Sequence, residues 1–431
     1  MKKTLIILLL SLFVGGTACG QGSGATVPRS LTQSHNNTIT QSAIMPLSET
    51  AWAGLLSCEP SNELYTSFSH SALHICDTAS GIDVVYNYGT FDFGTPHFVW
   101  KFATRTLDYC LSRESYRSFI ADYTDQRRCV WEQRLNLSRQ EVCNLFLMLE
   151  FNYQPEYRWY RYDFFRDNCA TRIRDMICKS LDHREIIYPK DDHTGKSYRE
   201  IVYTTNGNRP WWRFTVDLAL GARCDRDRST WECAFLPLEM MAQFDTLLVE
   251  SQESRVEPVR DDIVAGSRVK LLEDRREPLK RGVTPEVCFW GLFVIILTLT
   301  FFEQRKGWQL KIVDILLFLV PALLSLVALF LWFCSAHWCT KWNFNLLWAS
   351  PLFFYLSGAA LRKRKTSFNE YISTTYKVVA FIQIAMLLAL IGMMATGWPQ
   401  HFNRAILPIS LILFTRLAAS LLKTKTITKS F

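Results

Sequence analysis

Charged residues are scarce in this sequence. Asp, Glu, Lys and Arg make up 20% of the 431 residues, whereas hydrophobic residues make up 49%. This balance indicates that part of the chain lies in a membrane. The sequence also lacks a P-loop, a glycine-rich dinucleotide fingerprint and a convincing nucleic-acid-binding module. We therefore expect no nucleotide cofactor and no nucleic-acid partner.

The first 20 residues have the pattern of a secretory signal peptide. Lys2 and Lys3 precede an apolar run that is too short to span a bilayer comfortably, and small residues follow up to Ala18 and Cys19. Cys19 leaves lipoprotein processing open as an alternative, but Gly16 stands where such sites usually carry an aliphatic residue. We interpret residues 1–20 as a cleaved signal and residues 21–44 as a polar leader.

Export bears on the cysteines, which number 13, ten of them before residue 250. Disulfides form in oxidising compartments, so some of these residues are expected to pair. Cys224 and Cys233 are close in sequence and flank a polar turn, which makes them the first candidate pair. The sequence does not fix the connectivity.

A helix that begins near Cys169 carries the sharpest chemical signal. Asp167 and Asn168 are good helix N-cap types, and the apolar positions behind them place Cys169 on the buried face of the first turn. The helix dipole there favours a thiolate, the nucleophilic form of cysteine. A buried structural cysteine or half of a disulfide is the alternative.

Two predicted strands supply partners for this thiol. Residues 65–75 place His70 and His74 on one face, and residues 84–93 carry Tyr86 and Asn87. His70 suits a general base and Asn87 its orienting group. His70 is alternatively a satisfied structural histidine, His74 is a rival on the same face, and Asn87 fits a structural turn residue equally well.

The order of these residues favours one fold class. His70 precedes Cys169 by 99 positions, whereas papain-like enzymes normally place the cysteine first. A His-before-Cys order is the circularly permuted arrangement seen in lecithin:retinol acyltransferase-like proteins. A further amphipathic helix is predicted for residues 137–149, where Ser138 and Glu141 fit a capping box. The expected exported fold is therefore α+β and circularly permuted papain-like.

Four stretches in this order resemble the Lnb N-terminal periplasmic domain family. They read LLSCEPSNELYTSFSHSALHICD, VVYNYGTFDF, YRYDFFRDNCATRIRD and PWWRFTVDLALGARCDRD, followed by FLPLEM. The resemblance covers about residues 51–243 and continues at HWCTKWNFNLLWASPL. Two departures stand out, because Ser69 replaces the usual Gly before the histidine and His74 replaces a usual Arg.

This resemblance implies a lipoprotein N-acyltransferase of the bacterial inner membrane with its catalytic domain in the periplasm. It implies Cys169 and His70 as the catalytic pair, which we extend with Asn87 as orienting residue and with Asn168 and Tyr86 as oxyanion or site-supporting groups. The expected acyl donor is a membrane phospholipid, and the acceptor is the α-amine of a lipoprotein. No cofactor and no metal is expected.

Five apolar segments follow in the C-terminal third of the chain, at residues 287–302, 312–333, 346–361, 378–397 and 405–422. Eleven Lys and Arg residues lie in the loops after spans one, three and five, but only two, Lys341 and Arg404, lie after spans two and four. The positive-inside rule therefore places the C-terminus in the cytosol and the Cys169 domain outside.

These patterns predict four parts: a signal at 1–20, a catalytic domain at 45–250, a linker or short strand pair at 251–286 and a membrane domain at 287–423. The loop at 334–345 is expected to close over the site or touch substrate. His337 with Cys334 and Cys339 is only a weak indication of a metal because a fourth ligand is not obvious.

Two other functions remain open from the sequence. A cell-envelope cysteine peptidase or amidase would use the same Cys–His chemistry without needing membrane spans. A non-enzymatic membrane sensor or assembly factor would not need Cys169 at all.

Overall fold

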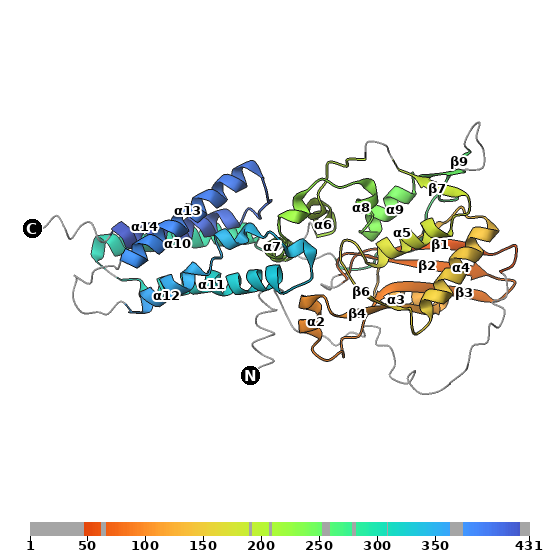
Figure 1. Cartoon of the computed structure of the whole chain (residues 1–431), viewed down its shortest axis with the longest axis horizontal. Helices are drawn as coiled ribbons and strands as arrows, with labels where there is room; N and C mark the ends of the chain where they lie inside the picture. The colour runs from red at the N-terminus through yellow and green to blue at the C-terminus, as the bar shows by residue number, and fades with distance from the viewer. Residues whose placement is uncertain are drawn as a thin grey trace, which may run out of the picture. The chain divides into compact units, whose positions relative to one another are not determined.

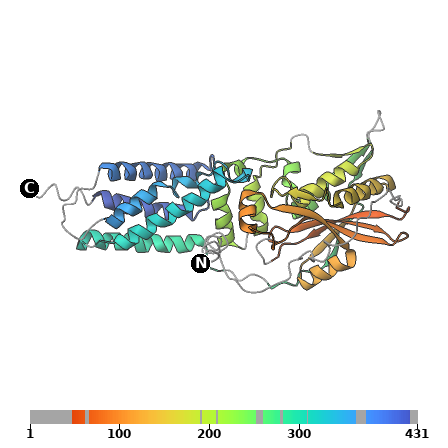
Figure 2. The same ribbon diagram turned by 60° about the horizontal axis from the view of Figure 1, so that its bottom comes forward.

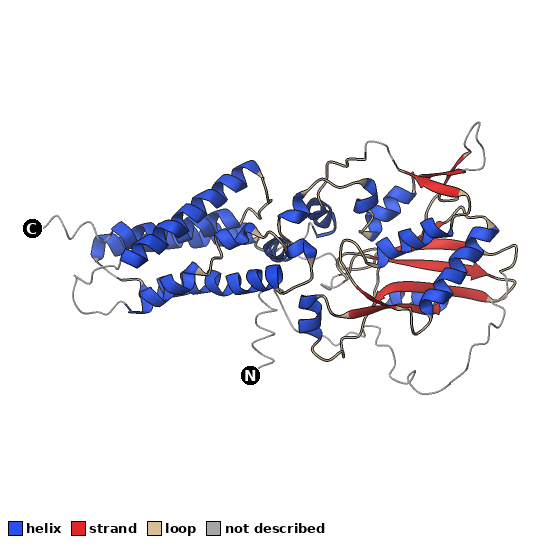
Figure 3. Cartoon of the chain, in the orientation of Figure 1, coloured by secondary structure: helices blue, strands red, loops and turns tan. Residues whose placement is uncertain are grey.

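The computed structural model describes residues 47–61, 66–188, 192–206, 209–251, 259–277, 282–307, 309–362 and 374–422. The predicted signal at 1–20, Cys19 and the leader at 21–44 lie outside these residues. The chain divides into two units. The sheet unit holds the described residues of 47–206 and 227–277, and the helical unit holds 209–226 with everything from 282 onward. Figure 3 shows the strands gathered in the sheet unit.

Ten strands are described in the sheet unit (Figure 1): β1 Trp52–Cys58, β2 His70–Asp77, β3 Ile82–Thr90, β4 Asp108–Ser115, β5 Val130–Arg134, β6 Trp159–Arg161, β7 Arg184–Ile187, β8 Leu248–Ser251, β9 Arg260–Asp262 and β10 Val269–Leu272. Seven strands form one sheet in the order β10-β5-β1-β2-β3-β4-β6, and β7-β8-β9 form a smaller sheet. Each described pairing is antiparallel.

The helices of the sheet unit are α2 Phe98–Thr104, α3 Tyr116–Asp125, α4 Arg139–Tyr153, α5 Cys169–Ser180, α6 Tyr198–Asn206, α8 Thr230–Cys233 and α9 Pro237–Phe244. The helical unit contains α7 Pro210–Ala219, η2 Ala222–Asp225, α10 Pro285–Lys306, α11 Lys311–Phe333, η3 Trp338–Thr340, η4 Phe344–Leu347, α12 Leu352–Arg362, α13 Thr374–Thr396 and α14 Ile406–Leu422.

The central sheet has a hydrophobic layer on each face because its side chains alternate. Leu73 and Tyr86 pack with Ile173 and Leu145, on the face covered by α4 and α5. Ala72 and its neighbours pack under α3 on the other face, together with Leu56, Val85, Phe119 and Tyr123. Figure 2 shows helices on both faces of the sheet. A period of two along β2 thus places His70, Ala72 and His74 on the α3 side.

Most predicted local elements form, with shifted ends. The capping box of Ser138 and Glu141 begins α4 as predicted. β2 begins at His70 and not at residue 65, because residues 66–68 form a turn and Ser69 has a positive φ of 72°. The predicted strand at 84–93 is β3, which begins at Ile82 and ends at Thr90.

The stretch 251–286 contributes strands to the sheet unit. β9 pairs with β8, and β10 pairs with β5 at the edge of the central sheet. Both strands therefore extend the sheet fold past residue 250, which the sequence suggested only as a short strand pair or linker. The polar composition of this stretch hides the pairing because both strands are largely exposed edge elements.

The helical unit has three helices that are long and apolar enough to span a membrane, α10, α11 and α13. η3–η4 and α12 together give a fourth if this pair, bent by 41°, is one span, and α14 is a shorter apolar helix of 17 residues. A fully buried side chain, Arg416 of α14, forms ion pairs with Glu303 of α10 and Asp314 of α11. Charged groups buried among apolar helices need such partners.

Candidate active site

Cys169 is the first residue of α5, next to the β2–β3 pair (Figure 1). Asn168 is the N-cap, and its side chain accepts a hydrogen bond from the Thr171 N–H while the Thr171 hydroxyl accepts one from the Asn168 N–H. This capping box fixes the first turn. Asp167 does not cap the helix; its carboxylate pairs with Arg172 at 2.5 Å.

The thiol of Cys169 is buried, with backbone N–H groups of Ser71, Ala170 and Cys169 around it. Burial raises its pKa, and those three N–H groups only partly offset the effect. The expectation that the helix N-terminus leaves Cys169 with a lowered pKa is therefore wrong, because desolvation outweighs the helix end. Cys169 rests as a neutral thiol and needs a base.

His70 has a bonding pattern that suits such a base. Its Nε2 lies 3.1 Å from Oδ1 of Asn87, so this nitrogen donates and Nδ1 is left as the acceptor. Nδ1 makes no hydrogen bond within the described part of the chain. Burial lowers the pKa of His70 to about 4; the bond to Asn87 acts in the opposite direction, and Arg128 adds a smaller lowering effect. The imidazole is therefore neutral near pH 7.

Asn87 continues the chain of hydrogen bonds. Its Nδ2 donates to Oε1 of Glu114 on β4 at 2.9 Å. The amide thus has both ends engaged, which fixes the orientation of Oδ1 toward His70. Glu114 was not singled out in the sequence, since a lone acidic residue outside any motif carries no signal of its own.

A β-bulge shapes the space beside the thiol. The β3–β4 register shifts between Asn87 and Thr90, and Gly89 in this bulge has φ of +92°. A Cβ on Gly89 would lie 3.8 Å from Cβ of Cys169 and 3.9 Å from the Tyr160 hydroxyl. Cys169 and the hydroxyl of Tyr160 therefore both lie close to Gly89, at the end of β3 that also carries Asn87. Bulges of this kind often re-aim groups next to active sites.

The hydroxyl of Tyr160 is buried and has no hydrogen-bond partner among the described residues. The guanidinium of Arg172 lies 3.6 Å from the centre of its ring and holds it in place. An orphaned donor beside a nucleophile is a candidate for binding a developing negative charge. No motif in the sequence distinguishes Tyr160 from the other tyrosines among the 16 in the chain.

The two predicted supporting residues have structural roles. The Asn168 amide donates both hydrogens, to the carbonyls of Phe164 and Phe235, so it has no donor left for an oxyanion. Tyr86 donates its hydroxyl to Glu150 of α4, under the face opposite to His70. Asn168 thus positions α5, and Tyr86 ties the sheet to α4.

His70 and Cys169 lie at the same end of the β2–β3 pair. The backbone N–H of Ser71, next to His70, lowers the pKa of the thiol, and a Cβ added to Gly89, two residues after Asn87, would lie 3.8 Å from Cβ of Cys169. No hydrogen bond joins the imidazole and the thiol within the described residues. Catalytic hydrogen bonds of this type often tighten only when substrate binds.

The cysteines are free thiols throughout the described residues. The predicted Cys224–Cys233 disulfide is therefore wrong in this structure. The sulfur of Cys224 donates to the Cys339 carbonyl at 3.4 Å, and the sulfur of Cys233 lies 3.5 Å from the Thr194 hydroxyl. Cys224 lies in η2 of the helical unit, and Cys233 lies in α8 of the sheet unit.

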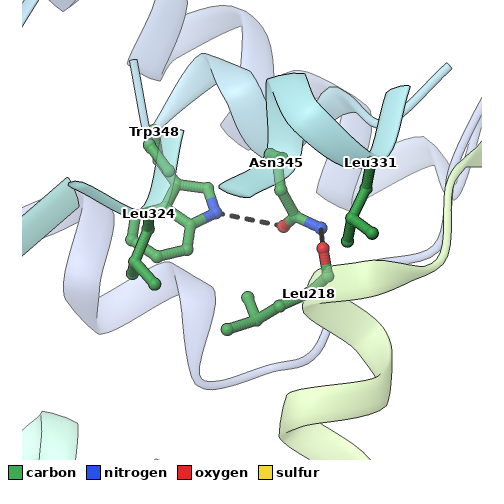
Figure 4. Close-up of a pocket in the computed structure, with 7 residues that line it drawn as sticks. Leu218, Leu324, Leu331, Asn345 and Trp348 are labelled. Atoms are coloured by element: carbon green, nitrogen blue, oxygen red, sulfur yellow. Dashed lines mark hydrogen bonds between the residues drawn. The ribbon is translucent and has the colours of Figure 1, made fainter. Parts of the chain in front are cut away.

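The loop at 334–345 contacts another part of the helical unit. Asn343 and Asn345 donate from their side chains to the carbonyls of Leu218 and Asp217 at the end of α7. Asn345 also lines a pocket of about 310 Å³ with Trp348, whose indole N–H donates to it (Figure 4). The described contacts of the loop are with α7 in its own unit, and the expectation that the loop closes over the site or touches substrate stays a prediction.

The chain matches two family models. The Lnb N-terminal periplasmic domain matches residues 43–188, and the Lnb transmembrane domain matches residues 277–427. No curated protein and no solved structure matched the chain. A membrane-embedded protein with a periplasmic-type N-terminal domain is the class that these two domains define. The chain belongs to the Lnb family, whose domains indicate a membrane protein that modifies lipoproteins.

Proposed function

We propose that this protein is a lipoprotein N-acyltransferase with Cys169 as nucleophile and His70 as general base. The observation that carries the proposal is the hydrogen-bond chain from His70 through Asn87 to Glu114, beside a buried cysteine at the start of a helix. A base oriented by a third group is the general signature of an activated nucleophile.

In the first half-reaction His70 Nδ1 takes the proton of the Cys169 thiol as the sulfur attacks an ester carbonyl of a phospholipid. Because the resting pair is neutral, this proton transfer accompanies the attack. The carbonyl oxygen becomes negative and is stabilised by the Cys169 N–H and the Tyr160 hydroxyl. The ester C–O bond then breaks, His70 returns the proton to the leaving oxygen, and a lysophospholipid departs from the thioester.

In the second half-reaction the α-amine of a diacylglyceryl-cysteine lipoprotein attacks the thioester. An α-amine with an ordinary pKa of about 8 is only partly neutral near pH 7, so proton removal by His70 assists the attack. The C–S bond breaks, an amide forms, and the thiol of Cys169 is restored. Both substrates are membrane lipids, which accounts for a catalytic domain fused to apolar helices.

The proposed topology has five spans. They are α10, α11 and α13, the bent pair η3–η4/α12, and the shorter helix α14. The support for this topology is the asymmetry of 11 to two in loop charges. In a protein whose exposed Cys288 and Cys334 are replaced by serine, a cysteine in place of the exposed His401 should react with an impermeant thiol reagent in whole cells, and one in place of Lys306 should not. Equal labelling of the two variants would rule out this topology.

The first test is conversion of diacyl to triacyl lipoprotein by the purified full-length protein in detergent with phospholipid. Mass spectrometry of the lipoprotein N-terminus should show one added acyl chain with the native protein and none with Cys169→Ala. Activity that survives this substitution would refute the mechanism, and no conversion by the native protein would favour the sensor or assembly role.

A cysteine peptidase or amidase is the alternative enzyme. Removing the membrane part is a poor discriminator, because residues 209–226 interrupt the sheet unit and belong with the helical unit. The intact protein should instead be offered phospholipid and a cell-wall peptide side by side. Release of lysophospholipid without peptide cleavage supports the acyltransferase, and the reverse supports the peptidase.

A further inference from the structure

A second polar cluster lies on the α3 face of the central sheet, four residues along β2 from His70. His74 is 3% exposed, and each of its ring nitrogens contacts a carboxylate. Nδ1 lies 2.7 Å from Oε1 of Glu132, and Nε2 lies 2.8 Å from Oδ1 of Asp83. Cys76, two residues further along β2, lies directly opposite Asp83 of β3.

The strand register builds this cluster from four neighbouring strands. Gly54 of β1 lies opposite His74, and a Cβ at Gly54 would come within 2.9 Å of Oε1 of Glu132. The absence of a side chain at Gly54 therefore lets Glu132 of β5 reach across β1 to His74. The ring of Tyr116 stacks on His74 at 4.2 Å between centroids, which holds the imidazole in one orientation.

The donor atoms of His74, Cys76 and Asp83 all lie within 4.8 Å of one another. An imidazole nitrogen, a thiolate and a carboxylate form a donor set that suits Zn²⁺, with a fourth position for water. Metal-bound histidines almost always donate their other N–H to a carboxylate, and Glu132 occupies that place here. The side chain of Asp83 is 55% exposed, so the cluster can be reached from solvent.

We propose that His74, Cys76 and Asp83 bind a borderline-soft divalent cation of the Zn²⁺ type, with Glu132 orienting the histidine. The cation would clamp β2 to β3 on the strand that carries His70. The proposal does not depend on the acyltransferase mechanism.

The charges around the cluster favour a cation. Carboxylate oxygens of Glu132 and Asp83 lie 2.7 and 2.8 Å from the two ring nitrogens of His74. A cation held by Nε2, the sulfur of Cys76 and Asp83 would lie between groups that each offer a lone pair or a negative charge.

A simple ion pair is the competing account, in which His74 binds the two carboxylates and Cys76 is a bystander. An Arg at position 74 can make the same ion pairs with the two carboxylates but cannot ligate a metal. His74→Arg therefore separates the two accounts while preserving the charge. Cys76→Ser removes only the sulfur.

The experiment consists of two separate titrations of the purified full-length protein under reducing conditions. Binding of Zn²⁺ is followed by calorimetry, and binding of Co²⁺ is followed by optical spectra. The native protein should bind one cation per chain with a thiolate-to-cobalt charge-transfer band, and its thermal midpoint should rise. Cys76→Ser should lose the band, and His74→Arg should lose binding. Glu132→Gln should keep the stoichiometry and weaken affinity by about 10- to 100-fold.

The twelve free cysteines in the described residues make non-specific zinc binding a necessary control. Cys143→Ser is the matched variant, since this thiol lies away from the cluster on α4, and it should bind as the native protein does. Equal binding by native, Cys76→Ser and His74→Arg proteins would overturn the proposal. If Cys76→Ser does not fold, X-ray absorption of the zinc-loaded native protein decides: one sulfur with nitrogen and oxygen ligands supports the site, and any other ligand set contradicts it.

Discussion

His70 and His74 lie four residues apart on the same face of β2, yet their surroundings differ in kind. His70 contacts a neutral amide, Asn87, and burial lowers its pKa to about 4. His74 lies between two carboxylates, Glu132 and Asp83. One environment keeps an imidazole neutral with a lone pair available, and the other places a carboxylate at each ring nitrogen.

The comparison shows that partners, and not position, assign roles to the two residues. A general base must be neutral and oriented before reaction, which an amide partner achieves. A ring between carboxylates is a poor base because its nitrogens are already engaged, but it is well placed to hold a cation. β2 sets only the spacing of the two histidines, whereas β3, β4 and β5 carry the side chains that contact them or their partners.

Separate substitutions of the two histidines should give the largest difference in acylation rate. His70→Ala is expected to lower the acylation rate by about 10²- to 10⁴-fold near neutral pH, because the buried thiol of Cys169 then lacks a base. Partial recovery at higher pH should follow, as thiolate forms without help. His74→Arg should keep the native rate within a few fold. A larger loss for His74→Arg than for His70→Ala would reverse the assignment.

Removing the orienting amide should have a smaller effect. Asn87→Ala leaves the imidazole in place but frees its Nε2, and a misplaced base costs up to about 100-fold in rate. Glu114→Gln should cost less, since its amide can still accept from Asn87. Single-turnover release of lysophospholipid measures both rates. Unchanged rates in Asn87→Ala would show that His70 needs no orientation from this side.

The pH dependence of the acylation step separates the two environments further. With a folded-state pKa of about 4, below the ordinary value of about 6.5, His70 stays neutral until the solution is strongly acidic. The rate should therefore hold from pH 7 to about 5.5 and reach half near pH 4. Measuring without acceptor avoids titration of the α-amine. Half-loss near pH 6.5 would indicate an exposed histidine.

The same shift affects stability in the opposite direction to a histidine that gains an acidic partner. Between pH 6.5 and 4 the unfolded chain takes up a proton at His70 that the folded chain does not. The free energy of unfolding should thus decrease as pH falls through this window, and His70→Asn should reduce that decrease. Denaturant titrations of the two proteins at pH 7 and pH 5 measure the difference.

The smallest expected effect, on the free energy of unfolding, comes from Ser69, the residue before His70. Ser69 has φ of 72°, a region that costs a non-glycine residue about 1–2 kcal/mol, and its hydroxyl is buried without a partner among the described residues. Ser69→Gly should raise the free energy of unfolding by about 1 kcal/mol in denaturant titrations while leaving the acylation rate near native. Ser69→Ala is the control, because it removes the hydroxyl and keeps the strain.

Local elements were predictable where short-range rules dominate. The capping box of Ser138 and Glu141 and the start of α5 near Cys169 follow from side chains three residues apart, and both are observed. Ser69 was singled out in the sequence as standing where glycine is expected. Its positive φ explains why glycine suits that position.

Long-range partners were not predictable in the same way. Glu114, Tyr160 and Glu132 enter the two clusters through strand register and a bulge, which a single sequence does not specify. The pKa of Cys169 was predicted with the wrong sign because burial depends on packing against β2 and β3. The Cys224–Cys233 pairing also failed, because short spacing in sequence does not establish a disulfide and both thiols are free.

The most direct test of the central claim is detection of the acyl-enzyme. Purified full-length protein is incubated with phospholipid and no lipoprotein acceptor, and the Cys169 peptide is analysed by mass spectrometry. We predict a mass increase of one acyl chain that hydroxylamine removes, strongly reduced in His70→Ala and absent in Cys169→Ser, whose hydroxyl is far harder to deprotonate than a thiol. A Cys169 peptide that stays unmodified while the protein converts diacyl to triacyl lipoprotein would contradict the account.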